Sequence, residues 1–553
     1  AYASVAPFPF QAHSRLMRKL AVLAALGIFV GVGAWAALAD HRAPIPDAAT
    51  DAVLAMRADL DEKDVSAEPT APLPVSVTTP ETPPNSVLIV ADDLGWRDVG
   101  YNFSEIRTPV IDRLASEGLT LNRFYAWPSC SPTRAALMTG KSPMRLGIMN
   151  PLSKLNPTGL PIEEETLANR LKAAGYQTAL VGKWHLGPRN LAYHPNNRGF
   201  DHFYGHLTGG IGYYDKVHGG SYDWQRNGET VRDDRYATHL VADEAVALIE
   251  GRDPDRPLFL YAAFGAPHLP NEAPEGALDT YGDITDPNRR AHAAMVSELD
   301  AAIGRIHAAV VEQGLNESTV IWFMSDNGGL YPYNPARHLP DFLIGPVAAN
   351  LLSVEMTPQF LRFITTNLRD GAADNRPFAG GKQSVSEGGV RVPSFVLWPG
   401  TLNPQSYNFM VTIQDVAPTL LAAAGVPLDE ANIDGRNVLS ALATNTTAAV
   451  KDYIVATRAL VHSDAIYRYP FKLIEDENGQ RLYNIESDPL ESEDIAAKEP
   501  DLVANLSSAL ANFPRGKSVA IPLQKVVNDP DYFGGEEDRK PWADQAYADK
   551  PGQ

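Results

Sequence analysis

Four short, continuous apolar runs constrain the fold more than any other feature of this sequence. Runs of this kind are typical of strands buried on both faces of a parallel sheet. They lie at residues 86–90, 178–182, 257–264 and 319–325. Helical patterning between them predicts helices at 108–118, 166–175, 237–249 and 288–311. Because open α/β sheets place their sites at the carboxyl ends of strands, the residues after each run are the candidates for chemistry.

Acidic and amide side chains follow the first and the last of these runs. Asp92 and Asp93 come directly after the first run, and Asp326 and Asn327 follow the last. Two adjacent carboxylates repel each other unless a cation neutralises them. Hard oxygen ligands suit Ca²⁺ or Mg²⁺. A solvated Asp-Asp turn is the alternative, but the position at the strand ends favours a metal site.

Cationic and imidazole side chains follow the other two runs. Lys183 and His185 come after the second run, and they point to the same side if the backbone stays extended there. His268 follows the third run, and Lys382 is bracketed by glycines that allow close approach of the backbone. These groups are candidates for binding an anion. Three more histidines fit no standard metal spacing and are expected in loops or in the core: His194, His202 and His206.

Cys130 is the single cysteine of the chain, so it has no partner for an intramolecular disulfide. A lone thiolate is also a poor site for a soft metal, which usually has several sulfur or imidazole ligands. A small buried hydrophobe or a reactive group remain as interpretations. We expect Thr133 to cap a helix that begins there, with Arg134 in its first turn. The free N–H groups at such a helix start favour anions.

The stretch Cys130-Ser131-Pro132-Thr133-Arg134, followed by Thr139 and Gly140, resembles the signature of the type I sulfatases. The resemblance extends over about residues 85–490 and is similar to the arylsulfatase B-like group in Lys183-Trp184-His185-Leu186-Gly187. It implies an alkaline-phosphatase-like α/β sandwich with a central mixed, mostly parallel sheet. It also implies a smaller C-terminal antiparallel sheet with a helix.

The same resemblance implies that Cys130 is oxidised to Cα-formylglycine by a formylglycine-generating enzyme, and that the aldehyde hydrate is the nucleophile. It implies Ca²⁺, with Mg²⁺ as the alternative, and catalytic roles for a group of side chains around it. The implied metal ligands are Asp92, Asp93, Asp326, Asn327 and the modified Cys130. The implied catalytic residues are Cys130, Arg134, Lys183, His185, His268 and Lys382.

The implied activity is hydrolysis of sulfate monoesters, with a sulfated small molecule or saccharide as substrate. A phosphate or phosphonate monoester hydrolase of the same fold is one alternative. A protein that binds sulfate esters without catalysis, because Cys130 stays unconverted, is the other. The formal charge of −20, from 47 basic and 67 acidic residues, argues against a nucleic-acid binder. An anionic substrate therefore requires a locally positive site in a negative protein.

Residues 1–39 have the layout of a secretory signal, with Arg15, Arg18 and Lys19 before an apolar run and Ala37-Leu38-Ala39 at its end. An uncleaved membrane anchor and a core helix are the alternatives. A signal predicts export to the periplasm or the extracellular space. We expect a linker over 40–84, the catalytic domain over 85–450, an α+β subdomain over 451–515 and a tail over 516–553.

Four local expectations concern individual segments of the chain. Within the helix at 288–311, we expect Glu298, Asp300 and Arg305 on the solvent face. A helix at 416–424 has Pro418 in its first turn. Residues 330–378 carry no recognisable chemistry and form either an insertion that covers the substrate or a peripheral hairpin. In the C-terminal subdomain we expect antiparallel strands at 453–456, 465–469, 471–474 and 481–485 and a helix at 500–513.

Overall fold

The computed structural model describes residues 82–218, 221–331, 370–449, 451–457 and 462–519. The predicted signal or anchor over 1–39 lies outside the described residues, as do most of the predicted linker over 40–84, most of the predicted insertion over 330–378 and most of the predicted tail over 516–553. Among the described residues, no helix is both long enough and apolar enough to span a bilayer.

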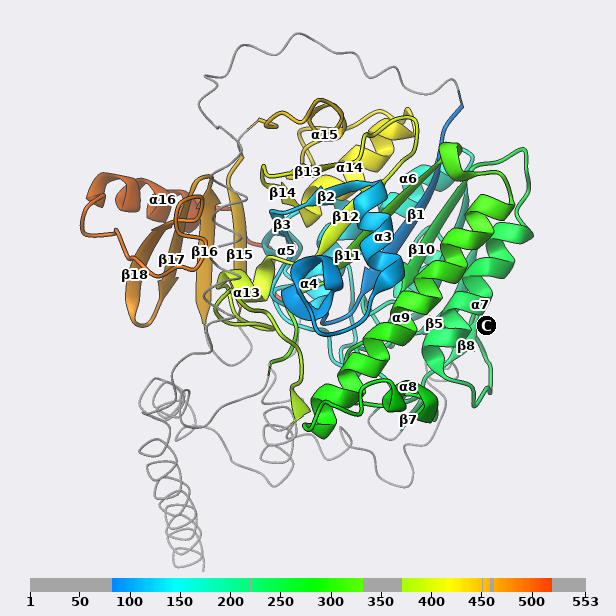
Figure 1. Ribbon diagram of the computed structural model, residues 1–553. Coiled ribbons are helices and arrows are strands. Elements are labelled where there is room, and N and C mark those ends of the chain that lie inside the picture. Colours follow the sequence, from blue (N-terminus) through cyan, green and yellow to red (C-terminus); the bar gives the residue numbers. More distant parts are fainter. Residues whose placement is uncertain (1–81, 219–220, 332–369, 450, 458–461, 520–553) are drawn as a thin grey trace, which may run out of the picture. The chain divides into compact units, whose positions relative to one another are not determined.

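Ten strands of the described chain form one large mixed sheet, and its central part is parallel (Figure 1). The parallel strands are β11 (Thr319–Ser325), β1 (Asn85–Ala91), β10 (Leu258–Ala263), β4 (Gln177–Lys183) and β5 (His202–His206), in that spatial order. Antiparallel pairing begins beyond them, at β12 (Ser394–Leu397) and at β8 (Gln225–Arg226). The edges are β2 (Leu119–Leu121) with β13 (Gln405–Tyr407), and β9 (Glu229–Thr230). The four predicted strands are therefore confirmed as neighbours in one sheet.

Helices cover both faces of this sheet, as the alternating side chains of β1 require. Val87 and Ile89 belong to a core shared with one set of helices, whereas Leu88 and Val90 belong to the core on the other face. The first set is α3 (Pro109–Glu117), α7 (Ala237–Glu250) and α9 (Pro287–Glu312). The second set is α4 (Cys130–Thr139), α6 (Leu167–Ala173) and α14 (Ile413–Ala423). The architecture is the predicted α/β sandwich of alkaline-phosphatase-like type.

A second, smaller sheet is formed by the C-terminal part of the chain, and all of its pairings are antiparallel. Its strands are β15 (Tyr453–Thr457), β16 (Ser463–Arg468), β17 (Phe471–Asp476) and β18 (Gly479–Asn484), with α16 (Pro500–Asn512) against them (Figure 1). The antiparallel sheet with a helix is confirmed. Short elements complete the fold: β3 (Phe124–Tyr125), β14 (Val411–Thr412), β6 (Val217–His218), β7 (Ser221–Tyr222), α5 (Pro143–Leu146), α8 (Glu275–Asp279), α13 (Glu387–Val390) and α15 (Leu439–Thr444).

Two local predictions are wrong. Asp300 is buried in α9, because its carboxylate accepts hydrogen bonds from the N–H groups of Val110 and Ile111 at the start of α3. These N–H groups favour the carboxylate, but burial has the larger effect and raises the pKa of Asp300 to about 6. Pro418 lies in the middle of α14, since that helix begins at Ile413, earlier than predicted.

A buried ionic cluster joins the C-terminal sheet to α13. The Lys472 ammonium lies 3.1 Å from Glu387 Oε1 and 2.6 Å from Glu491 Oε1. Lys472 and Glu387 are fully buried, and Glu491 is nearly so. Glu387 also accepts hydrogen bonds from the hydroxyl groups of Tyr125 and Tyr467. The cluster fixes the segment that follows the loop of Lys382.

We expect Lys472→Met to lower the free energy of unfolding by about 3–5 kcal/mol, because two buried carboxylates lose their cation. Denaturant titration measures this loss. Lys498→Met is the matched control, since Lys498 pairs with Glu493 at the surface with both side chains about two-thirds exposed. Exposed pairs contribute little, so the control keeps the wild-type midpoint. Equal midpoints for the two variants would contradict the structural role of the cluster.

Candidate active site

The predicted metal ligands come together because β1 and β11 are parallel neighbours. Ala91 pairs with Ser325 in the register of these strands, so the residues that follow them emerge side by side. The Asp93 N–H donates to Asp326 Oδ1 over 3.2 Å, and Asn327 Nδ2 donates to Asp93 Oδ1 over 2.7 Å. Asn327 Oδ1 is buried and accepts no hydrogen bond from the described residues. A buried amide oxygen in that state is a candidate ligand for a cation.

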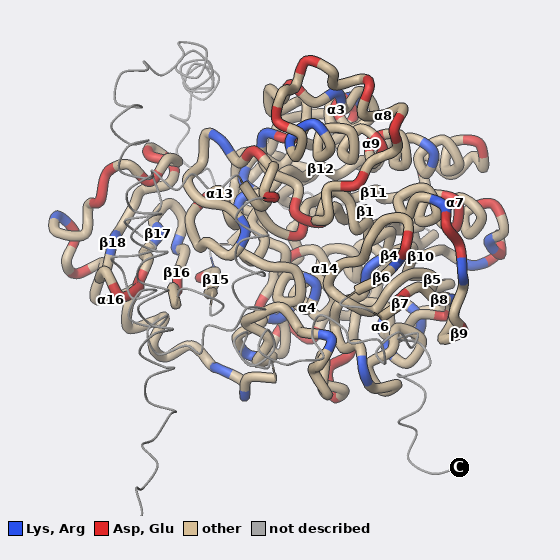
Figure 2. The backbone as a smooth tube through the Cα atoms, turned by 90° about the horizontal axis from the view of Figure 1, so that it is seen from below, with Lys and Arg blue, Asp and Glu red and all other residues tan. Residues whose placement is uncertain are grey.

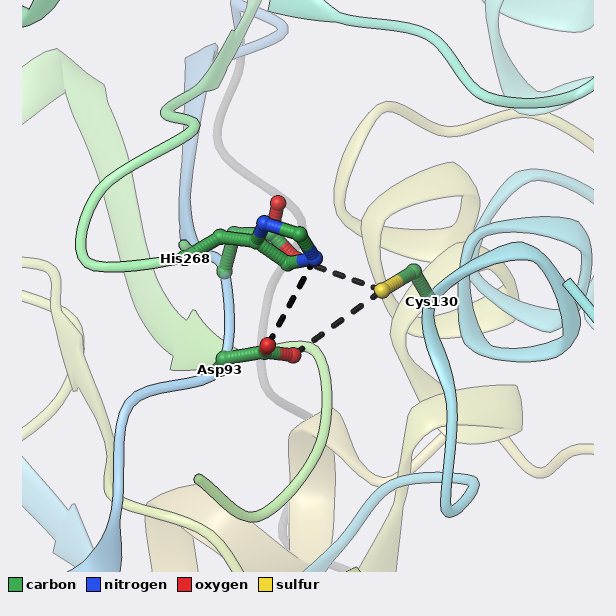
Figure 3. A group of neighbouring side chains, drawn as sticks. Asp93, Cys130 and His268 are labelled. Carbon is green, nitrogen blue, oxygen red and sulfur yellow. Dashed lines mark hydrogen bonds and ion pairs between the residues drawn. The ribbon is translucent and has the colours of Figure 1, made fainter. Parts of the chain in front are cut away.

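Cys130 faces these carboxylates from the first turn of α4 (Figure 3). Its Sγ lies 3.3 Å from Asp92 Oδ1 and 4.0 Å from Asp93 Oδ1. With His268, these residues form a group whose ligand atoms all lie within 4.8 Å of one another. The prediction that the helix begins at Thr133 is wrong, because α4 begins at Cys130 itself. The thiol therefore lies within the field of the helix N-terminus.

Thr133 does not cap the helix as predicted, because its side chain bonds to the backbone of Trp127. Its hydroxyl accepts a hydrogen bond from the Trp127 N–H over 3.0 Å and donates to the Trp127 carbonyl over 3.1 Å. The two bonds tie the chain before α4 to its first turn. The approach to Cys130 is thus fixed by a side chain that lies one turn later.

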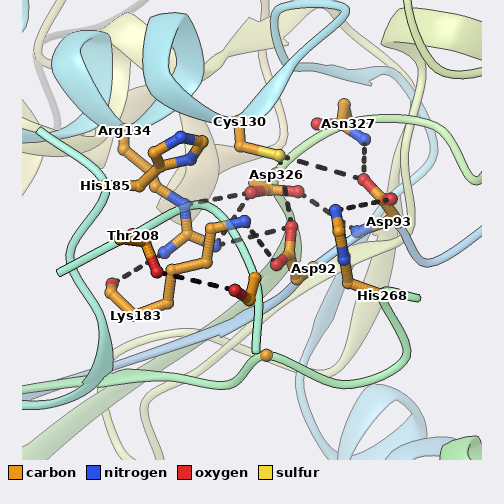
Figure 4. A network of polar contacts seen from close by, with 12 residues as sticks. Asp92, Asp93, Cys130, Arg134, Lys183, His185, Thr208, His268, Asp326 and Asn327 are labelled. Carbon is orange, nitrogen blue, oxygen red and sulfur yellow. Dashed lines mark hydrogen bonds and ion pairs between the residues drawn. The ribbon is translucent and has the colours of Figure 1, made fainter. Parts of the chain in front are cut away.

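Each of the three carboxylates is paired with a cation of the chain, and Figure 4 shows Arg134 and Lys183 beside Asp326 and Asp92. Arg134 lies 2.8 Å from Asp326 Oδ2 and also donates to the Lys183 carbonyl over 2.9 Å. The two other pairs are Lys183 Nζ with Asp92 Oδ2 at 2.5 Å and Lys382 Nζ with Asp93 Oδ2 at 2.6 Å. The predicted cationic groups are therefore gathered in one place, but three carboxylates balance the charges of Arg134, Lys183 and Lys382, so these side chains alone do not make the site positive.

The two site histidines are held by backbone carbonyls, which set their tautomers. His185 Nε2 lies 2.9 Å from the Leu152 carbonyl and must carry the proton, so the buried Nδ1 is left as a lone pair without a described partner. His268 Nδ1 lies 2.7 Å from the Leu269 carbonyl, and its Nε2 faces Asp93 Oδ2 at 3.6 Å. A carbonyl accepts only, so the ring nitrogen that faces it donates.

The expectation of an extended backbone through His185 is wrong. Strand β4 ends at Lys183, and His185 has a φ of +58°, in the left-handed region. Left-handed backbone is uncommon for a residue other than glycine and marks a position where the surroundings hold the chain. The imidazole nevertheless reaches the site and lies near Cys130 and Arg134 (Figure 4).

Burial and neighbouring charges shift the pKa values of the site. Burial and then the carboxylates of Asp326 and Asp92 raise the pKa of the Cys130 thiol well above its usual value. Burial also raises the pKa of Asp93, but the cations around it, Lys382 foremost, outweigh that effect and lower the pKa below its usual range. Burial and Lys382 lower the pKa of His268 to about 3. An unmodified thiol at this position is therefore neutral and a weak nucleophile.

Two adjacent glycines, Gly209 and Gly210, pack closely against the rings of both site histidines, which the sequence did not predict. A Cβ on Gly209 would lie 2.7 Å from His185 Cε1, and a Cβ on Gly210 would lie 3.0 Å from His268 Cε1. Asp223 fixes this segment by accepting hydrogen bonds from the N–H groups of Leu207 and Thr208. The Gly-Gly pair is a visible signal in the sequence, but its partners lie far away along the chain.

The remaining predicted histidines stay outside the site. His194 Nε2 lies 2.8 Å from Gln225 Oε1, and His202 Nε2 lies 2.8 Å from Glu244 Oε1. His206 is buried in β5 and stacks on Trp224. Among the described residues, none of the three belongs to the group of side chains that could hold a metal ion.

Comparison with known proteins identifies the family. The model of the Sulfatase family matches residues 84–426, which is more than half of the chain. The chain belongs to the sulfatase family. The family's enzymes hydrolyse sulfate esters. The matched range of this sulfatase includes every residue of the cluster described above.

Individual relatives agree with that assignment. Arylsulfatase J of Mus musculus is 30% identical over 516 residues, which cover 83% of this sulfatase and 79% of the relative. N-acetylgalactosamine-6-sulfatase of Homo sapiens is 32% identical over 389 residues, covering 65% and 66% of the two chains. The crystal structure of Ps i-CgsB superposes with a TM-score of 0.70 at 29% identity, covering 81% of this sulfatase and 98% of that chain. A second structure of Ps i-CgsB holds k-i-k-neocarrahexaose.

We expect Gly209→Ala to lower kcat of this sulfatase about a hundredfold, because the new methyl group displaces the His185 ring and small misplacements at a site have effects of this size. Gly276→Ala is the matched control, since a Cβ there meets open space. Steady-state kinetics of the two variants make the comparison. A Gly209→Ala enzyme with wild-type kcat would show that the His185 ring tolerates displacement.

Proposed function

We propose that this sulfatase releases sulfate from sulfated carbohydrates after conversion of Cys130 to Cα-formylglycine by a formylglycine-generating enzyme, and that it works with a bound divalent cation. The observation that carries the proposal is the position of Cys130. Its Sγ lies 3.3 Å from Asp92 Oδ1, at a helix start and inside a ring of three carboxylates and three cations. The carboxylates that raise the pKa of the thiol would also oppose ionisation of a hydroxyl there, and a bound divalent cation would offset their effect.

The residues fit a hard cation. The donors are oxygen atoms at neighbouring strand ends, and the buried Asn327 Oδ1 has no described partner. We propose Ca²⁺, with Mg²⁺ as the alternative, held by Asp92, Asp93, Asp326, Asn327 and the modified side chain of position 130. When bound, the cation supplies positive charge to the sulfate group and to the hydroxyl of the aldehyde hydrate.

Lys183 and Lys382 are the residues that we propose for binding the sulfate group. Each ammonium is buried against a carboxylate of the cluster, at 2.5 Å from Asp92 and 2.6 Å from Asp93. A cation that already lies in a buried site needs no reorganisation when the negative charge of the transition state develops. Arg134 holds Asp326 and the Lys183 carbonyl, which keeps the ligands in place.

The two histidines are suited to opposite proton transfers. We propose that His268 protonates the leaving alcohol, with Lys382 as the alternative acid. The negative charge of the bound sulfate ester opposes the effects that lower the pKa of His268, so substrate binding promotes its protonation. His185 keeps a free lone pair on Nδ1, which can take the proton from the hydroxyl at position 130 when sulfate departs.

A sulfate-release screen tests this function. The substrates are 4-nitrophenyl sulfate and sulfated sugars of known linkage, including galactosamine 6-sulfate and carrageenan oligosaccharides, the classes named for relatives. We expect sulfate release from the aryl ester and from at least one sugar, and a much lower rate on 4-nitrophenyl phosphate. A faster rate on the phosphate would replace the proposal by a phosphoester hydrolase. No release from any sulfate ester by fully converted enzyme would refute it.

We propose that the protein is exported through the general secretory route. The proposal is supported by the basic flank, the apolar run and Ala37-Leu38-Ala39 in residues 1–39. N-terminal sequencing of the protein from the extracytoplasmic fraction tests it. A mature chain that begins near Asp40 indicates a cleaved signal, and an intact N-terminus in the membrane fraction indicates an anchor. We keep the predicted catalytic domain over 85–450, subdomain over 451–515 and tail over 516–553 as part of the same proposal.

A further inference from the structure

A groove of about 450 Å³ lies between α7 and α9, and none of its lining residues belongs to the cluster around Cys130. The two helices run side by side over the sheet (Figure 1). We propose that this groove binds an unsulfated sugar ring of a saccharide substrate, an inference that rests on the proposed function and extends it to substrate recognition. Its volume is within the range of roughly 300–1,000 Å³ that is typical of ligand sites.

The wall of the groove is aromatic. Tyr214 is 41% exposed, which places it among the few large hydrophobic side chains of the described chain that face solvent. Its ring lies 5.4 Å from that of Tyr236, which in turn lies 5.2 Å from the ring of His239. An aromatic side chain that is apolar on its faces and polar at its end suits a sugar, which presents C–H groups on its faces and hydroxyls at its rim.

The polar rim of the groove is balanced in charge. Arg235 and Arg305 each lie 2.6 Å from Asp243, and His239 lies 2.6 Å from Glu298. Both guanidinium groups pair with the Asp243 carboxylate, and the Glu298 carboxylate pairs with His239. Figure 2 shows acidic residues on α7, and the guanidinium groups come from Arg235, which precedes that helix, and from Arg305 of α9. Such a rim offers donors and acceptors for hydroxyl groups without a net attraction for a second sulfate, so the preferred occupant is an unsulfated ring.

A chain of contacts connects the groove to His268. The Tyr236 ring stacks on Tyr213 at 5.2 Å with an interplanar angle of 22°. The Tyr213 hydroxyl donates to the His268 carbonyl over 2.9 Å and to the Gly265 carbonyl over 2.8 Å. One pair of stacked rings therefore separates the groove from the segment that carries His268. The proposal places another ring of the saccharide against Tyr214 while its sulfate lies at the site.

Kinetics on a short and a long substrate test this inference. The variants are Tyr214→Ala, Tyr214→Phe and the control Val311→Ala, which truncates an exposed apolar side chain of α9 outside the groove. The substrates are 4-nitrophenyl sulfate and a κ-carrageenan tetrasaccharide, in which sulfated and unsulfated units alternate. We expect Tyr214→Ala to raise KM for the tetrasaccharide about tenfold, the size of one lost aromatic contact, and to leave both constants for the aryl ester unchanged. Tyr214→Phe and Val311→Ala keep wild-type values.

An unchanged KM for the tetrasaccharide in Tyr214→Ala, or an equal rise for both substrates, would overturn the groove as a sugar site. If the wild-type enzyme releases sulfate from neither of these substrates nor from any other ester of the screen, the proposed function fails. Whenever the tetrasaccharide is not hydrolysed, binding of κ-carrageenan tests the groove separately. In that arm, Cys130→Ala and the double variant Cys130→Ala/Tyr214→Ala migrate through native gels that contain κ-carrageenan. Retardation that is lost in the double variant supports the groove, and equal migration of the two proteins refutes it.

Discussion

Cys130→Ala is expected to lower kcat for sulfate release by at least about 10⁴-fold, the scale at which loss of a nucleophile acts. The folded state should be unaffected. The Sγ atom contacts the carboxylates of Asp92 and Asp93, and α4 retains its start and its packing without it. Equal thermal midpoints of variant and wild type, measured beside the kinetics, would separate lost chemistry from lost structure.

Two controls sharpen this test. Met138→Leu changes another buried side chain of the same helix while conserving volume, so we expect it to keep activity. Cys130→Ser should be inactive unless the host modifies serine. Peptide mass spectrometry of the wild-type protein should show residue 130 with its thiol replaced by an aldehyde oxygen. A fully active sample with an unmodified thiol would contradict the proposed mechanism.

The sequence predicts the central strands well because their signal is local and strong. The run at 319–325 coincides with β11, and β1, β4 and β10 match their predicted runs within a residue or two. Strand β5 was not expected, because His202–His206 carries two histidines and a glycine. It becomes a strand through its pairing with β4, and such pairing cannot be inferred from the segment alone.

In the candidate site, too, local signals were predictable from the sequence, whereas contacts between distant residues were not. Side chains at strand ends were expected to meet because parallel neighbours place their carboxyl ends at one edge. The features that the sequence did not predict depend on contacts between residues that are distant along the chain. Asp300 is buried because α3 presents its N–H groups to it, and His185 turns out of the strand direction because Leu152 and Gly209 hold its ring. Asp223 reads as an ordinary loop acid until its bonds to Leu207 and Thr208 are known.

The charges of the site would couple the binding of the proposed cation to the binding of an anion. Each buried carboxylate is already paired with a cation from the chain, in the pairs Asp92–Lys183, Asp93–Lys382 and Asp326–Arg134. A divalent cation that joins this balanced set leaves an excess of two positive charges in a buried place. Bound sulfate, a dianion, neutralises that excess. The cation and sulfate should therefore bind with positive coupling, and each should raise the affinity for the other by the same factor.

Removal of the divalent cation by a chelator is accordingly expected to lower kcat/KM by about a thousandfold or more, because the cation contributes several kcal/mol to the transition state. It should also abolish protection by inorganic sulfate. With Ca²⁺ present, sulfate at a hundred times its Kd stabilises the fold by about 2.7 kcal/mol, and without Ca²⁺ the shift in the thermal midpoint should vanish. Chloride at equal ionic strength is the control for screening, and re-addition of Ca²⁺ should restore both effects. If sulfate protects the fold equally with chelator and with Ca²⁺, the predicted coupling is wrong. Lys183 and Lys382 would then bind the anion without help from a cation.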